Sequence, residues 1–143
     1  MNDHSRRLEL SLLFLRLTVF LVMFMWTVDK FVNPGHAAAV FESFYRIPGL
    51  EAVVLYGIAA AEMVLLLLFV SGVLKTYTYG VVLVLHGIST LSSFKQYLAP
   101  FEGSHLLFFA AWPMLAACFA LFVLRDEDRL WSLGKTGTAD TGS

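Results

Sequence analysis

Cysteine is almost absent from this chain of 143 residues. Cys118 is the single one, which excludes an intramolecular disulfide, a CxxC redox pair and a metal cluster built on cysteines. Charge is also scarce, at 15% of the residues, and neither sign dominates, since the net charge is -1. We therefore expect no strongly basic surface and no nucleic-acid partner. No cofactor motif and no activated nucleophile stand out, so the sequence leaves any catalytic residue unknown.

Apolar sequence is what the chain has in excess. Hydrophobic residues make up 58% of it, and the mean hydropathy is +0.72. The charged residues cluster in short segments between four apolar runs, at residues 8–30, 52–74, 76–95 and 105–124. Each run is long enough to cross a hydrocarbon core of about 30 Å as a helix, whereas strands would leave backbone groups unpaired in lipid. We predict an all-α integral membrane four-helix bundle over residues 1–125, followed by a polar, disordered cytoplasmic tail over residues 126–143.

The distribution of lysine and arginine predicts the orientation of these spans. Six of these cations fall on the side of the membrane that holds both termini, and three fall on the other side. Because positive residues favour the cytoplasmic side, we expect both termini to be cytoplasmic.

The first outer loop, residues 33–51, carries a helical pattern of its own. Asn33-Pro34 is typical of an N-cap followed by proline in the first turn, and the Pro-Gly pair at 48–49 is expected to end the helix. An apolar stripe runs between them at helical spacing, which is typical of a short helix in the membrane interface. Candidates for docking a partner protein on this stripe are Phe41, Phe44 and Tyr45.

Ionisable residues inside a span are costly, so they are candidates for function. Glu62 lies near the middle of the second run, His86 near the middle of the third, and Arg16 nearer the cytoplasmic end of the first. We predict that Glu62 contacts Arg16 or His86. Such a pair could equally be a structural lock between helices, and His86 could simply bond Thr90 one turn away. Lys30 falls on the same helical face as Arg16, and Tyr97 falls on the same face as His86. The candidates for a ligand site or proton pathway are therefore Arg16, Lys30, Glu62, His86 and Tyr97. The histidines form no metal-binding motif, so we predict no metal site.

The chain resembles the DoxX family of small membrane proteins. The resemblance rests on Leu15-Arg16-Leu17 and an apolar helix ending in Asp29-Lys30-Phe31, on Tyr56-Gly57-Ile58 leading to Glu62, and on the four-span layout. It covers about residues 8–125. This chain departs from the family pattern at residues 26–28, where Trp-Thr-Val stands in a position that commonly holds glycine, which puts a closer subfamily assignment in doubt.

The resemblance implies a multi-pass protein of the bacterial inner membrane that is associated with a redox system. Arg16, Lys30 and Glu62 are the family-like positions, and the resemblance gives none of them a catalytic role. We expect an accessory or membrane-anchor subunit of a quinone-linked redox system, with a redox enzyme as its protein partner and no covalently bound cofactor. One alternative is a structural or assembly factor without chemistry of its own. Another is a small proton- or ion-coupled transport subunit, which would require a homo-oligomer because four spans show no inverted repeat.

Overall fold

The computed structural model describes residues 2–134, and that part of the chain is helical, with turns between the helices and no strand. The prediction of an all-α fold is therefore confirmed. In chain order the elements are α1 (Asp3–Val32), α2 (Pro34–Tyr45), α3 (Ala52–Val70), α4 (Lys75–Ser92), α5 (Phe94–Leu98), the 3-10 helix η1 (His105–Ala110) and α6 (Ala111–Val123).

Three segments among the described residues are long and apolar enough to cross a membrane: α1, α3 and the continuous η1–α6 segment, His105–Val123. They correspond to the first, second and fourth predicted spans. The predicted third span, α4, is less apolar because its first turns hold Lys75, Thr76 and Thr78 and its centre holds His86. The fourth predicted span starts as a 3-10 helix, and Pro113 lies in the first turn of α6.

The outer surface of these helices is apolar and their interior contains polar groups. Large apolar side chains such as Phe14, Val53 and Phe119 are exposed, whereas Arg16 and Thr90 are buried. This distribution is the reverse of that in a water-soluble protein, and it suits a lipid environment in which the polar groups must bond one another. Together with the three apolar helices, it indicates a membrane protein.

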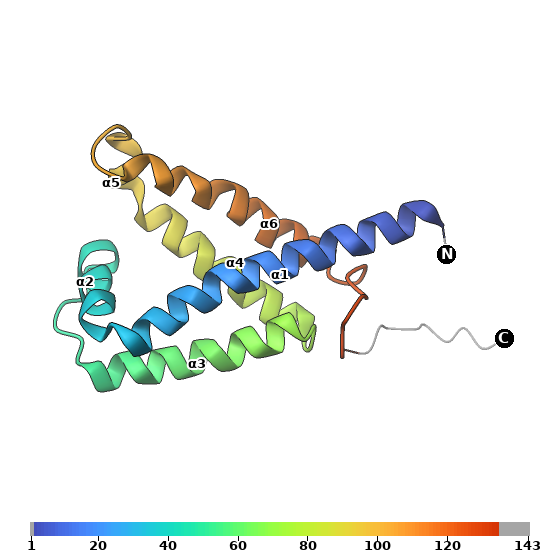
Figure 1. Ribbon diagram of the computed structural model, residues 1–143, viewed down its shortest axis with the longest axis horizontal. Helices are drawn as coiled ribbons and strands as arrows, with labels where there is room; N and C mark the ends of the chain where they lie inside the picture. Colours follow the sequence, from blue (N-terminus) through green and yellow to red (C-terminus); the bar gives the residue numbers. More distant parts are fainter. Residues whose placement is uncertain (1, 135–143) are drawn as a thin grey trace.

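The hydrophobic core occupies only one half of the bundle. Its buried members come from all four long helices and lie towards the end at which α1 begins and α6 ends: Leu12, Val19, Leu66, Phe69, Tyr79, Val82, Cys118 and Leu121. Towards the opposite end, which carries α2 and α5, α1 and α6 diverge (Figure 1). The chain is thus tightly packed at one end and open at the other.

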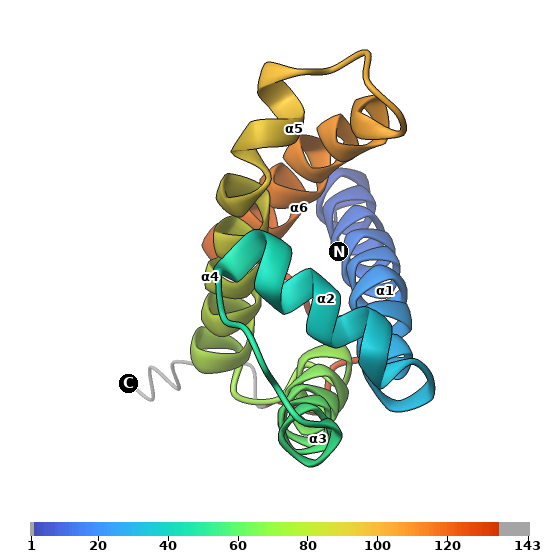
Figure 2. The same ribbon diagram turned by 90° about the vertical axis from the view of Figure 1, so that its left-hand side faces the viewer.

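The short helix predicted in the first outer loop is present as α2, and it crosses the open end of the bundle (Figure 2). Asn33 takes the N-cap position and Pro34 the first helical position, as predicted. However, the Asn33 side chain makes no capping hydrogen bond, and its Nδ2 instead donates to Asp29 at 3.4 Å. The helix ends at Tyr45, before the Pro-Gly pair, because Arg46 adopts a left-handed conformation with φ 56°.

The segment after α6 is packed against the bundle up to Gly134, which differs from the predicted disordered tail. Asp128 is completely buried, and the Leu133 N–H donates to the Ser71 carbonyl at 2.8 Å. The prediction of disorder from residue 126 onward is therefore wrong for residues 126–134, while residues 135–143 lie outside the described part of the chain. Sequence composition suggested a solvated tail, but buried charges in the bundle bind it.

Candidate functional site

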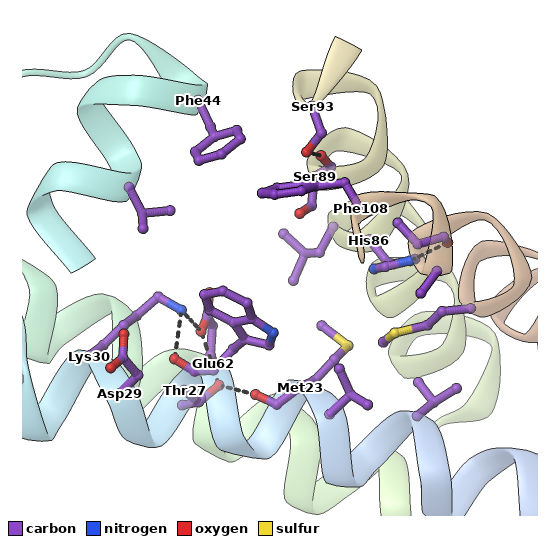
Figure 3. Close-up of a pocket in the computed structure, with 18 of the residues that line it drawn as sticks. Met23, Thr27, Asp29, Lys30, Phe44, Glu62, His86, Ser89, Ser93 and Phe108 are labelled. Carbon is purple, nitrogen blue, oxygen red and sulfur yellow. Dashed lines mark hydrogen bonds and ion pairs between the residues drawn. The ribbon is translucent and has the colours of Figure 1, made fainter. Parts of the chain in front are cut away.

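A cavity of about 680 Å³ occupies the half of the bundle that the core leaves open. Side chains from α1, α2, α3, α4 and the η1–α6 segment line it, and most of them are apolar (Figure 3). Its polar groups gather on two walls, one formed by α1 with α3 and the other by α4. A mainly apolar cavity with a few convergent polar groups is the usual form of a small-molecule site.

The first polar wall is an ion pair between Lys30 on α1 and Glu62 on α3. Lys30 Nζ lies 2.9 Å from Glu62 Oε2, and the buried Thr27 donates its hydroxyl to the same oxygen at 3.1 Å. Thr27 and Lys30 are neighbours on one face of α1 because they are three residues apart. The sequence analysis named both Lys30 and Glu62 as candidates but did not predict that they pair.

The second polar wall is His86 on α4. Its Nε2 lies 3.0 Å from the Ala111 carbonyl, which can only accept, so Nε2 must carry a proton. Nδ1 lies on the side of the ring that faces the cavity and has no hydrogen-bond partner among the described residues (Figure 3). In the neutral ring Nδ1 therefore offers a lone pair to a ligand. Thr90 accompanies the ring as predicted, with its hydroxyl 3.3 Å from Nε2, and Ser89 and Ser93 extend the same wall.

Helix α2 supplies an aromatic cover at the end of the cavity. The Phe44 ring stacks on Phe108 of η1 with their centroids 5.8 Å apart, and the Phe41 and Tyr45 rings are 5.2 Å apart. Phe41, Phe44 and Tyr45 all line the cavity and are half-buried. These three residues were proposed to dock a partner protein, but their side chains face inward, so a docking role gains no support from their orientation.

Arg16 does not belong to this site, which corrects the predicted contact with Glu62. Its side chain is fully buried at the opposite end of the bundle, with Nη1 3.0 Å from Asp128 Oδ2 and 3.2 Å from the Tyr79 hydroxyl. Its Nη2 donates to the carbonyls of Leu130 and Trp131 at 2.5 and 3.2 Å. His86 does not contact Glu62 either. Arg16 is therefore a structural residue that holds the segment after α6.

Asp128 is the residue that the sequence analysis missed, because it lies beyond the last apolar run within a charged cluster. One signal could have found it. Arg16 lies nearer the N-terminal end of its run, whereas Glu62 lies near the middle of its own, so the best partner for Arg16 would be an acidic residue at that end of the bundle. Among the acidic residues at that end, Asp126, Glu127 and Asp128 closely follow the fourth run, whereas Asp3 and Glu9 belong to the same helix as Arg16.

Tyr97, the remaining candidate, also lies outside the cavity lining. Its hydroxyl donates to the Thr90 carbonyl at 2.9 Å, and its ring packs against Phe109 and Trp112 with centroids 5.3 and 5.6 Å away. These contacts anchor α5 to the end of α4 and to the η1–α6 segment. Tyr97 is therefore a packing residue rather than a ligand-contacting one.

The polar groups that line the cavity offer hydrogen bonds and charge pairing. Within residues 2–134, no group of three His, Cys, Asp or Glu side chains is placed to hold a metal ion.

Comparisons of the chain with protein-family models, with curated proteins and with solved structures found no match. The residues themselves define a membrane-protein cavity that could hold a largely apolar molecule with a polar head.

Proposed function

We propose that this chain is a DoxX-like, four-span protein of a bacterial inner membrane that binds a quinone in its cavity as an accessory subunit of a redox system. The observation that carries the proposal is the placement of two unlike polar groups on opposite walls of one apolar cavity. Lys30 is a hydrogen-bond donor on one wall, and His86 Nδ1 is an acceptor on the other.

A quinone head fits this pair because it has oxygens on opposite sides of a flat ring. In the reduced form, one hydroxyl can donate to His86 Nδ1 while the other oxygen accepts from Lys30 Nζ. Glu62 keeps the Lys30 ammonium in place and compensates its charge. The Phe44 and Phe108 rings offer stacking partners to the head group.

The topology in the membrane follows from the same proposal. We take α4 as a membrane span in addition to α1, α3 and η1–α6, because it carries outward-facing Val81, Val84 and Ile88 and packs between α3 and α6. Both termini are then cytoplasmic, and α2 lies at the outer surface. In this proposal a partner enzyme carries the electrons, while this subunit holds the quinone.

The test is to purify the chain from native membranes in mild detergent and to measure the quinone that copurifies per chain. We expect stoichiometric quinone with the unaltered protein. The variants His86→Phe and Lys30→Met should lower quinone affinity about tenfold each, since each removes one hydrogen bond to the head. Glu42→Gln is the matched control, because Glu42 is an exposed polar residue of α2 that does not line the cavity.

Two results would contradict the proposal. One is a pure protein that contains only bulk membrane lipid and does not take up added quinone. The other is quinone binding that both cavity variants leave unchanged while they remain folded. Mass spectrometry of copurifying proteins in the same preparation identifies a redox enzyme if the accessory role is correct.

A further inference from the structure

We infer that the cavity is entered sideways from the lipid, between α1 and the η1–α6 segment, and that its ligand keeps an apolar tail in this opening. The inference rests on the proposed function, because it specifies how a quinone would be bound. It adds that the ligand must be a lipid-phase molecule with a long apolar chain, rather than a water-soluble one.

The exposure of the lining residues locates the opening. All lining residues on α2, α3 and α4 are buried or half-buried. The exposed ones belong only to α1 and to the η1–α6 segment, and we call these five residues the portal: Val22, Trp26, Leu107, Ala110 and Pro113. Val22 is 41% exposed, Trp26 55% and Leu107 75%. The cavity therefore reaches the surface between these two elements.

The arrangement of the helices explains why the opening is there. The buried core holds α1 and α6 together through residues such as Val19 and Cys118. Beyond that level the two helices diverge (Figure 1). The buried members of the core among residues 2–134 lie towards the other end of the bundle. The end of the bundle is instead crossed by α2, whose buried Ala37 and stacked Phe44 cover it (Figure 2).

The chemistry of the portal indicates what passes through it. All five portal residues are uncharged and apolar apart from the indole N–H of Trp26. They lie on two of the segments that are apolar enough to cross a membrane, so the portal faces hydrocarbon. A polar solute gains nothing there, whereas an apolar chain fits both the portal and the surrounding lipid. The polar groups Lys30, Glu62 and His86 lie deeper, where a head group would end.

Single cysteines can test this arrangement, because Cys118 is the only native cysteine and is buried. In a Cys118→Ala protein reconstituted in liposomes, Val22→Cys and Leu107→Cys report on the portal. Their neighbours Leu21→Cys and Leu106→Cys are matched controls, since both side chains are exposed, at 57% and 59%, yet do not line the cavity. A lipid-soluble maleimide labels all four, and protection is measured with a long-chain quinone and with a tail-less quinone of the same head.

Binding itself is followed separately, by quenching of Trp26 fluorescence in a Trp112→Phe, Trp131→Phe background. We expect both quinones to quench Trp26 saturably, since Trp26 lines the cavity. Only the long-chain quinone should slow labelling at positions 22 and 107, by about tenfold at saturation, as expected for a site occupied about nine-tenths of the time.

The outcomes separate the two proposals. If neither quinone quenches Trp26 saturably, the proposed quinone site is wrong. If both quinones bind but the long-chain one leaves positions 22 and 107 as reactive as 21 and 106, quinone binding stands and the lateral portal is overturned. Equal protection by the tail-less quinone would also overturn the portal, because it would place the head group rather than the tail there.

Discussion

Arg16 of α1 and Asp128 of the segment after α6 form an ion pair in which both side chains are completely buried, with Nη1 and Oδ2 3.0 Å apart. The pair joins the first long helix to the segment that follows α6, so it links residues far apart in the sequence. Lys75 Nζ also donates to the Asp128 carbonyl. At this end of the bundle a polar cluster binds the segment after α6, residues 126–134.

Removing one partner of this pair should be strongly destabilising. Asp128→Ala leaves the Arg16 charge buried without its carboxylate, and such losses typically cost about 3–5 kcal/mol. We expect a clearly lower midpoint of thermal unfolding in detergent. Glu127→Ala is the control, because Glu127 pairs with Arg129 at 3.4 Å in a partly exposed position, and it should change the midpoint little. Equal midpoints for the two variants would show that the buried pair is not a lock.

Tyr79 contributes to the same cluster through its hydroxyl. That group donates to Asp128 Oδ2 at 2.6 Å and accepts from Arg16 Nη1 at 3.2 Å. Tyr79→Phe keeps the ring against Phe69 but removes both hydrogen bonds, so we expect a loss of about 1–3 kcal/mol in unfolding free energy. Tyr77→Phe on the same helix removes an exposed hydroxyl and serves as the control. Identical denaturation of the two variants would rule out this role.

Gly72 should be intolerant of a side chain. Its φ is +69°, and an added Cβ would lie 2.5 Å from Ser132 Oγ. Gly72→Ala should therefore destabilise the protein by about 1–3 kcal/mol and loosen the segment after α6. Gly57→Ala is a matched control within α3, where an added Cβ meets nothing within 4 Å, and it should be neutral or stabilising by up to about 1 kcal/mol. Limited proteolysis of the C-terminal segment would distinguish the two.

The Lys30–Glu62 pair should behave as a coupled unit. Glu62→Ala leaves the Lys30 ammonium in a mainly apolar cavity with only a long contact to the Trp26 carbonyl, at 3.5 Å. We expect a loss of about 1–3 kcal/mol in stability, which Lys30→Met in the same chain should largely restore. Thermal unfolding of the two single variants and the double variant gives the coupling free energy between the two side chains. Strictly additive losses would mean that the two residues do not interact.

Phe44 should control access of water-soluble reagents to the cavity. A Ser89→Cys side chain on the α4 wall, in the Cys118→Ala background, should react slowly with a charged thiol reagent while α2 covers the cavity end. Phe44→Ala removes the ring that stacks on Phe108 and should speed that reaction. Ser43→Ala, at an exposed position of the same helix, should not. If Ser89→Cys is already fully reactive without Phe44→Ala, α2 does not cover the cavity.

Several features of this fold could be predicted from residue order alone. In lipid, the backbone N–H and C=O groups of a segment must form their hydrogen bonds within that segment, so a long apolar run becomes a long helix. The four apolar runs therefore predicted the helices α1, α3, α4 and η1–α6. The Asn33-Pro34 pair marked the start of α2. These properties depend on neighbours within a few turns, so the local sequence carries them.

The partners of the buried charges depended on tertiary structure. Periodicity gives the face of a helix but not which charged residue of another helix lies opposite it. The sequence therefore suggested Arg16 or His86 as the partner of Glu62, whereas Glu62 pairs with Lys30 and Arg16 pairs with Asp128. The same holds for residues 126–134. Their composition is typical of a solvated tail, and only the tertiary structure shows that the buried Arg16 binds them. The cavity, too, arises only because α1 and α6 diverge beyond their shared core. That divergence is a property of how helices pack together, and no single helix encodes it.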